Sequence, residues 1–142
     1  MLKMLIAVDG SEHSNHAIEA VAKLASKTLQ RQVVLLNVLE APLMFGDLPT
    51  FGLEQIEVAQ KKQQDDVLAA ALERARACGL TVGSTRRAQG QAASEIVRVV
   101  AECGADQIVL GTRGMGALSS LFMGSVAQRV VHLAEVPVLL VK

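Results

Sequence analysis

Residues 106–133 read DQIVLGTRGMGALSSLFMGSVAQRVVHL, and this stretch decides the fold. It begins with an apolar run without polar alternation, which is typical of a strand buried on both faces of a parallel sheet. The chain then passes through four of its eleven glycines and enters a helical pattern near Gly124. Strand, loop and helix in this order indicate one part of a βαβ unit.

Similar units fill the rest of the chain. Further apolar runs predict buried strands at 4–8, 33–39 and 136–141, with a weaker candidate at 80–86. Helical patterns lie between them, at 10–29, 53–78, 92–103 and 125–134. Because strand and helix alternate throughout, we expect right-handed crossovers, a three-layer α/β sandwich and a single domain spanning 1–142.

Composition narrows the class of partner. Hydrophobic residues make up 51% of the 142, enough for one buried core, and 14 basic residues balance 14 acidic ones. A chain without net charge has no field that attracts nucleic acid or anionic lipid. It also has no Trp or Tyr on which bases would stack. We therefore expect no nucleic-acid partner.

The N-terminal apolar run ends at Asp9, which makes it too short for a signal peptide. No other run approaches the roughly 18 apolar residues of a membrane span. We therefore expect a cytoplasmic protein with no membrane contact. Cys78 and Cys103 each precede a glycine at an expected helix end, so we interpret both as buried structural residues.

The glycine stretch is one of two candidate binding segments, and VDGS at 8–11 is the other. In open α/β sheets, ligands bind beyond the carboxyl ends of the strands. A helix starting near Gly124 offers the backbone N–H groups of Gly124, Ser125 and Val126, and the Ser125 hydroxyl, to phosphate oxygens. Gly111 and Gly114 would let the loop close over the same anion.

The alternative is that these glycines form only a connection and that Ser125 is an ordinary N-cap. The stretch contains neither GxxxxGK[ST] nor GxGxxG. This disfavours a P-loop hydrolase and a Rossmann dehydrogenase.

The motif spacing resembles that of a known family. Gly111, two residues, Gly114, nine residues, and then Gly124 and Ser125 are similar to the nucleotide motif of the universal stress proteins. The opening MLIAVDGSEHSNHA and the closing SVAQRVVHLAEVPVLLVK are also similar to the ends of that family, so the resemblance covers the whole chain. It implies an adenine-nucleotide alpha hydrolase-like fold with five parallel strands in the order 3-2-1-4-5.

The resemblance also implies a cofactor, which is ATP or the related ADP or AMP, with Mg²⁺ held by phosphates and water. By analogy with the ATP-binding branch, Asp9 meets the nucleoside, the backbone at Ala7 and Val8 lies beside the base, and Val38 contacts adenine. The phosphate and ribose contacts are then Gly111, Gly114, Gly124 and Ser125, with Thr112, Arg113 and Val126 between or next to them. Asp9 has an alternative as a turn former, and Arg113 one as a solvent-facing side chain.

The resemblance implies a nucleotide-dependent stress-response regulator, with a slow ATP hydrolase or a nucleotide-free interaction module as alternatives. The apolar strand at 136–141 would lie at a sheet edge, so we expect a homodimer there, with a covering loop as the alternative, together with unidentified protein partners. No residues form a catalytic constellation, because Asp9, Ser11 and His13 are merely crowded at one helix start. His13 and His16 lack a third ligand, so no metal site is expected.

Overall fold

The computed structural model of the protein describes residues 1–24, 30–40, 52–114 and 123–142. Strands and helices alternate along these residues, as the sequence predicts. In chain order they are β1 (Leu2–Ala7), α1 (Glu12–Leu24), β2 (Arg31–Leu39), α2 (Leu53–Ala77), β3 (Val82–Gln89), α3 (Ala92–Cys103), β4 (Gln107–Gly111), α4 (Ser125–Leu133) and β5 (Val138–Val141).

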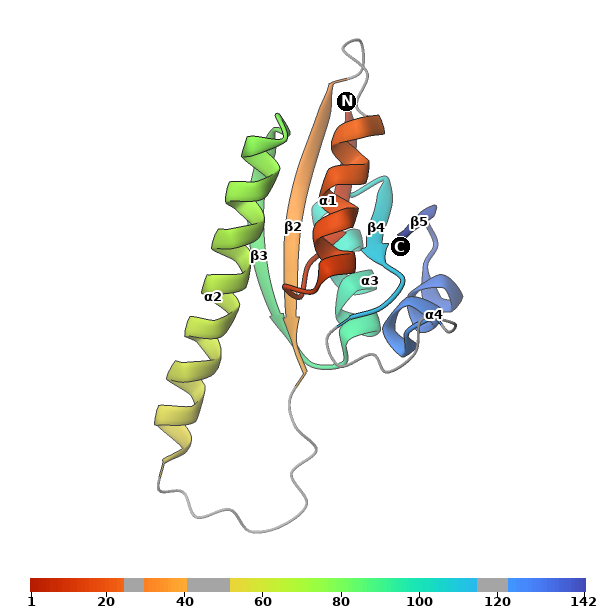
Figure 1. Cartoon of the computed structure of the whole chain (residues 1–142). Helices are drawn as coiled ribbons and strands as arrows, with labels where there is room; N and C mark the ends of the chain where they lie inside the picture. Colours follow the sequence, from red (N-terminus) through yellow and green to blue (C-terminus); the bar gives the residue numbers. More distant parts are fainter. Residues whose placement is uncertain (25–29, 41–51, 115–122) are drawn as a thin grey trace.

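The strands form one parallel sheet in the order β3-β2-β1-β4-β5, which confirms the expected topology. The chain starts at the centre, builds outward through β2 and β3, and returns to the other side for β4 and β5. The strand order therefore reverses between β1 and β4, which is where an open α/β sheet leaves a crevice. In Figure 1 the carboxyl ends of the strands point downward.

Helices cover both faces of the sheet (Figure 1). Met4, Ile6 and Val109 point to the face that α1 and α2 cover, and Leu5 and Ile108 point to the face of α3 and α4. Successive strand residues are thus all removed from water, at about 1.5–3 kcal/mol for each large side chain. This explains why the central strands appear in the sequence as continuous apolar runs.

The outer strand β3 shows why its sequence pattern is weaker. Of its eight residues only Ala88 is buried, since β3 lies at the edge of the sheet, where α2 and α3 each contact it only in part. The strand occupies Val82–Gln89 instead of the expected 80–86. An edge strand needs few apolar residues, so periodicity located it poorly.

Helix ends follow local chemistry. The hydroxyl of Ser11 accepts a hydrogen bond from Ser14 N at 3.2 Å, so Ser11 caps α1. Helix α3 ends at Gly104, whose φ of 65° is the left-handed conformation that stops helices. The expected first helix is described as far as Leu24, and its predicted continuation through 25–29 lies outside the described residues.

The expected burial of Cys78 is wrong, and Cys103 is only half-buried. Cys78 follows the last turn of α2, on the solvent side of an outer helix, so its position before a glycine does not bring it into the core.

Among the described helices, none combines the length and apolar character that a membrane crossing requires.

Candidate functional site

A cleft of about 500 Å³ opens at the carboxyl ends of β1, β2 and β4, where the strand order reverses. It brings together all of the residues that the sequence and the resemblance selected. These are Ala7, Val8, Asp9, Val38, Gly111, Thr112, Arg113, Gly114, Gly124, Ser125 and Val126. Lining residues that the sequence did not select include Ser14, Leu36, Glu40, Ala92, Ile96, Leu110 and Ala127.

The motif glycines each leave room for another part of the chain. A β-carbon on Gly111 would lie 2.7 Å from Cβ of His13, and one on Gly124 would lie 3.2 Å from the carbonyl oxygen of Thr112. A β-carbon on Gly114 would lie 2.5 Å from Oδ2 of Asp9. The spacing of the motif therefore reflects close packing around the cleft as well as access for a ligand.

The start of α4 differs from the sequence interpretation in two ways. Gly124, and not Ser125, is the N-cap, so the alternative of Ser125 as an ordinary cap is wrong. The N–H of Gly124 donates to the Thr112 carbonyl at 2.6 Å, which corrects its expected role as a phosphate donor. The first bond within the helix runs from Gln128 N to Gly124 O, so the N–H groups of Ser125, Val126 and Ala127 belong to the open first turn.

Asp9 lies where β1 meets α1. Its Oδ1 accepts from Ser11 N at 2.9 Å, and its own N–H donates to the Ser14 hydroxyl at 3.2 Å. The turn-forming alternative for Asp9 is therefore confirmed. Because Oδ2 faces Gly114 at the rim of the cleft, the same carboxylate is also placed to accept from a hydroxyl of a bound molecule.

Part of the cleft is apolar, lined by Leu36 and Val38 of β2, Ile96 of α3 and Leu110 of β4. The backbone of Val8 is already hydrogen-bonded within the protein, because its N–H donates to Leu36 O at 2.8 Å and its carbonyl accepts from Asn37 Nδ2 at 2.8 Å. This part of the site is therefore suited to a flat apolar group such as a base.

A buried amide network supports this apolar end. Gln64 of α2 donates through Nε2 to the carbonyl of Asn37 at 3.3 Å and to that of Ala88 at 3.1 Å. Asn37 in turn donates to Val8, so the network joins α2, β3, β2 and β1. Both amide side chains are buried, and hydrogen bonding offsets the cost of removing them from water.

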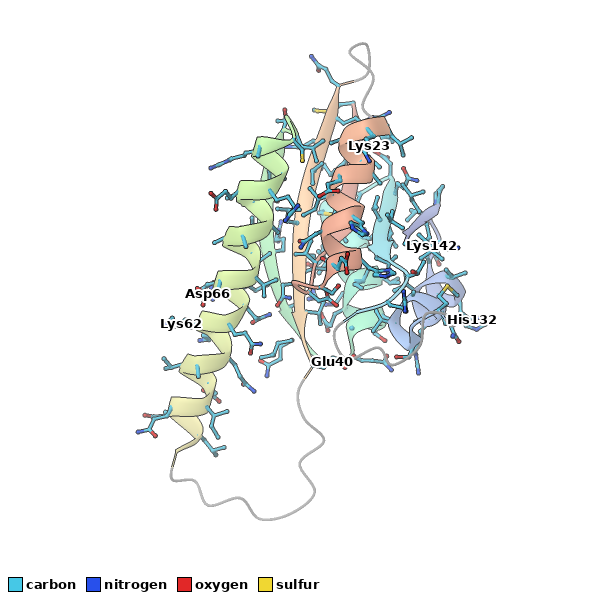
Figure 2. The ribbon with its side chains drawn as sticks, in the orientation of Figure 1. Lys23, Glu40, Lys62, Asp66, His132 and Lys142 are labelled. Carbon is cyan, nitrogen blue, oxygen red and sulfur yellow. The ribbon has the colours of Figure 1, made fainter. Side chains whose placement is uncertain are left out.

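Glu40 is a cleft residue that the sequence did not indicate. Its Oε1 accepts from the N–H of Ala92, the first residue of α3, at 3.2 Å, and Figure 2 labels its side chain at the end of β2. The starts of α3 and α4 both border the cleft, and the carboxylate of Glu40 occupies the start of α3. A contact across 52 residues leaves no local pattern, so sequence reasoning had no signal for it.

Arg113 lies against α1 instead of extending freely into solvent. Its Nη2 is 3.0 Å from Nε2 of His13, whose Nδ1 is 3.1 Å from the Thr112 hydroxyl. His16 instead has its Nδ1 2.9 Å from the carbonyl oxygen of Lys142. Within the described part of the chain, no group of three or more His, Cys, Asp or Glu side chains is arranged to hold a metal ion.

The cleft is chemically divided. The start of α4 and the guanidinium of Arg113 suit anionic oxygens, Asp9 suits hydroxyls, and the β2 end suits an apolar ring. A phosphorylated nucleoside has these three chemical parts in this order. The residues present therefore fit a nucleotide.

Comparisons with known proteins agree with this description. The sequence model of the Universal stress protein family matches residues 1–142. The chain is 35% identical to universal stress protein YxiE of Bacillus subtilis, over 99% of this chain and 98% of that one. It is also 35% identical to a universal stress protein of Thermus aquaticus, over 98% and 97% of the two chains.

Solved structures share the fold. Universal stress protein UspA of Lactobacillus plantarum superposes with a TM-score of 0.81 at 18% identity, covering 99% of this chain and 97% of its own. The universal stress protein of Archaeoglobus fulgidus in complex with dAMP gives 0.71 at 21% identity, over 100% and 98%. A family protein of Arabidopsis thaliana with AMP bound gives 0.72 at 20% identity, over 100% and 92%.

Proposed function

The chain belongs to the universal stress protein family, and we propose that residues 1–142 act as one domain that binds an adenine nucleotide. The observation that carries the proposal is the cleft, in which the start of a helix, a carboxylate and an apolar wall are combined. Relatives of the same fold that hold AMP and dAMP support the choice of adenine nucleotides.

In the proposed arrangement the phosphates lie at the first turn of α4, near the N–H groups of Ser125 and Val126 and near Arg113. The ribose hydroxyls lie within reach of Asp9, and the adenine ring packs on Val38 at the apolar end. Glu40 favours this direction, because its negative charge lies near the start of α3 and repels phosphate from there.

The finer parts of the proposal concern the ligand and its use. ATP is the proposed ligand, and ADP and AMP would bind more weakly. Mg²⁺ would be held largely by phosphates and water. Bound nucleotide would act as a signal that unidentified protein partners recognise in the cytoplasm during stress.

The test is calorimetric titration of the purified protein with ATP, ADP, AMP and adenosine, each with and without Mg²⁺. We expect micromolar binding of ATP and weaker binding of adenosine, because adenosine lacks the phosphates. A Gly124→Glu variant serves as the comparison. Its side chain would crowd the Thr112 carbonyl and repel phosphate, so a folded variant should not bind ATP.

Failure of the wild-type protein to bind any adenine nucleotide would contradict the proposal and favour a nucleotide-free interaction module. Release of phosphate from bound ATP, measured in the same samples, would instead identify the slow hydrolase.

The proposal includes a homodimer formed along β5. Ile108 N donates to Pro137 O and Thr112 N donates to Val141 O, so alternate residues of β5 bond to β4. Val138 and Leu140 therefore direct their backbone groups toward the open edge, where a second copy can pair. Leu140→Pro removes a donor on that side only, and we expect it to convert a dimer into a folded monomer in light-scattering measurements. A dimer that survives this change would contradict pairing through β5.

A further inference from the structure

Alternate residues at the end of β2 form a row along the cleft. Leu36, Val38 and Glu40 are spaced two apart, and all three line the cleft. Successive side chains of a strand point to opposite sides, so residues two apart share one side. The row therefore changes from two apolar side chains to a carboxylate just past Leu39, the last residue of β2.

A hydrogen bond from the start of α3 fixes the place of this carboxylate. Oε1 of Glu40 accepts from the N–H of Ala92 at 3.2 Å, and the side chain is labelled in Figure 2. The end of β2 is also held, because Gly90 N donates to Leu39 O at 2.9 Å. The position of the carboxylate is thus set by two contacts between segments that are distant in the chain.

Two apolar side chains of the cleft are neighbours of this carboxylate. Val38 precedes Glu40 by two residues on the same side of the chain, and it lines the cleft. Ile96 also lines the cleft, one helical turn after Ala92, whose N–H binds Glu40. A flat ring that packs on Val38 and Ile96 would therefore bring one of its edges to Glu40.

Backbone carbonyls in this part of the protein already accept hydrogen bonds. The carbonyl of Leu36 accepts from Val8 N, and that of Val8 accepts from Asn37. The carbonyl of Asn37 accepts from Gln64. A carboxylate has about four lone-pair positions, and among the described residues Glu40 uses one of them for Ala92. Glu40 therefore has more capacity to accept from a ligand than these carbonyls have.

Other carboxylates do not take this position. Among the described residues that line the cleft, the carboxylates are those of Asp9 and Glu40. Asp9 lies at the start of α1 and faces Gly114. Glu95 of α3 pairs with Arg98 at 2.6 Å and does not line the cleft. A base on Val38 therefore meets the carboxylate of Glu40.

Purine bases differ in the group at position 6. Adenine has an amino group there, which donates hydrogen bonds and is the only N–H group of the base in a nucleotide. Guanine and hypoxanthine have a carbonyl oxygen there, which only accepts. A carboxylate opposite position 6 therefore binds adenine, whereas it leaves the oxygen of the other two bases without a donor.

We propose that Glu40 determines the base specificity of the cleft, by accepting a hydrogen bond from the 6-amino group of adenine. The carboxylate is held by Ala92 N before the base arrives, so little ordering is needed on binding. This inference rests on the proposed nucleotide site and adds the residue that selects its base.

The first test varies the ligand and leaves the protein unchanged. Calorimetric titration compares ATP with inosine triphosphate and with purine riboside triphosphate, which has only hydrogen at position 6. All three have the same ribose and phosphates, so any repulsion between Glu40 and phosphate cancels in the ratios of their affinities.

We expect ATP to bind wild type about tenfold more tightly than purine riboside triphosphate does, which corresponds to one hydrogen bond to a charged group. Glu40 is exposed, so water competes for its oxygens and the lower end of the usual range applies. Inosine triphosphate should bind more weakly still, because its oxygen would face the carboxylate.

The second test varies the protein. Glu40→Gln keeps an acceptor for Ala92 N and offers an N–H group to the oxygen of hypoxanthine. We expect the preference for ATP over inosine triphosphate to fall at least about tenfold in this variant. Glu40→Ala should bind ATP and purine riboside triphosphate equally.

Glu135→Gln is the matched control, since it removes the same charge from an exposed residue that does not line the cleft. This variant should keep the affinity ratios of wild type.

Equal or reversed affinities of wild type for ATP and purine riboside triphosphate would overturn the role of Glu40 and leave the nucleotide site intact. This outcome needs no variant to fold. A preference for ATP that persists unchanged in folded Glu40→Gln and Glu40→Ala would also overturn it. Absence of binding of all three ligands to wild type would instead overturn the proposed function, and the role of Glu40 with it.

Discussion

Gly114 leaves the space that the carboxylate of Asp9 occupies, since a β-carbon at Gly114 would lie 2.5 Å from Oδ2 of Asp9. Two segments more than a hundred residues apart thus meet at the rim of the cleft, one contributing a charge and the other an absent side chain. A glycine in a nucleotide motif is often interpreted as room for the ligand. Here the missing side chain of Gly114 also leaves space for the carboxylate of Asp9.

Gly114→Ala should therefore weaken nucleotide binding by moving Asp9. We expect about a tenfold loss of ATP affinity, similar to that of Asp9→Asn, since both changes remove a hydrogen bond from a charged acceptor. Calorimetric titration with ATP measures the affinity of each variant. The double variant should lose little more than either single variant, and additive losses would show that Gly114 does not act through Asp9.

Gln64→Ala should destabilise the fold, because it leaves the carbonyls of Asn37 and Ala88 without their buried donor. We expect the free energy of unfolding to fall by about 1–3 kcal/mol, measured by urea denaturation. The neighbouring exposed residue provides a matched control, and Gln63→Ala should change stability by less than about 0.5 kcal/mol. Equal effects of the two changes would contradict the importance of the network.

Glu40→Ala should have two effects. Losing the acceptor for the N–H of Ala92 should lower the free energy of unfolding by about 1 kcal/mol, as for a lost helix cap. Glu40→Gln keeps an acceptor oxygen and should retain most of that stability.

Both Glu40 variants remove a negative charge from the cleft. We therefore expect ATP to bind more tightly relative to adenosine in both, as calorimetry would measure. An unchanged ratio of the two affinities would show that Glu40 does not act on the phosphates.

Cys78 should react with a thiol reagent faster than Cys103. Cys78 is exposed after the last turn of α2, whereas Cys103 is half-buried, with its Sγ 3.8 Å from the carbonyl oxygen of Val100. Timed absorbance with a chromogenic disulfide should show two phases. Cys78→Ser should remove the faster phase, and removal of that phase by Cys103→Ser would contradict the described burial.

The sequence by itself determined the alternation of strands and helices and the burial of the central strands on both faces. Local residue patterns indicate both, because a strand covered by helices on each side must be apolar at every position. The glycine spacing and the motifs near both ends of the chain also indicated the family, and with it the strand order and eleven of the residues that line the cleft.

Tertiary structure alone decided which polar groups of those residues are still available. The N–H of Gly124 donates to the Thr112 carbonyl, Glu40 accepts from the start of α3, and Arg113 contacts His13, each between segments distant in the chain or across a loop. Local propensity carries no information about such contacts. They form only when the parallel crossovers bring the carboxyl ends of β1, β2 and β4 to one edge of the sheet.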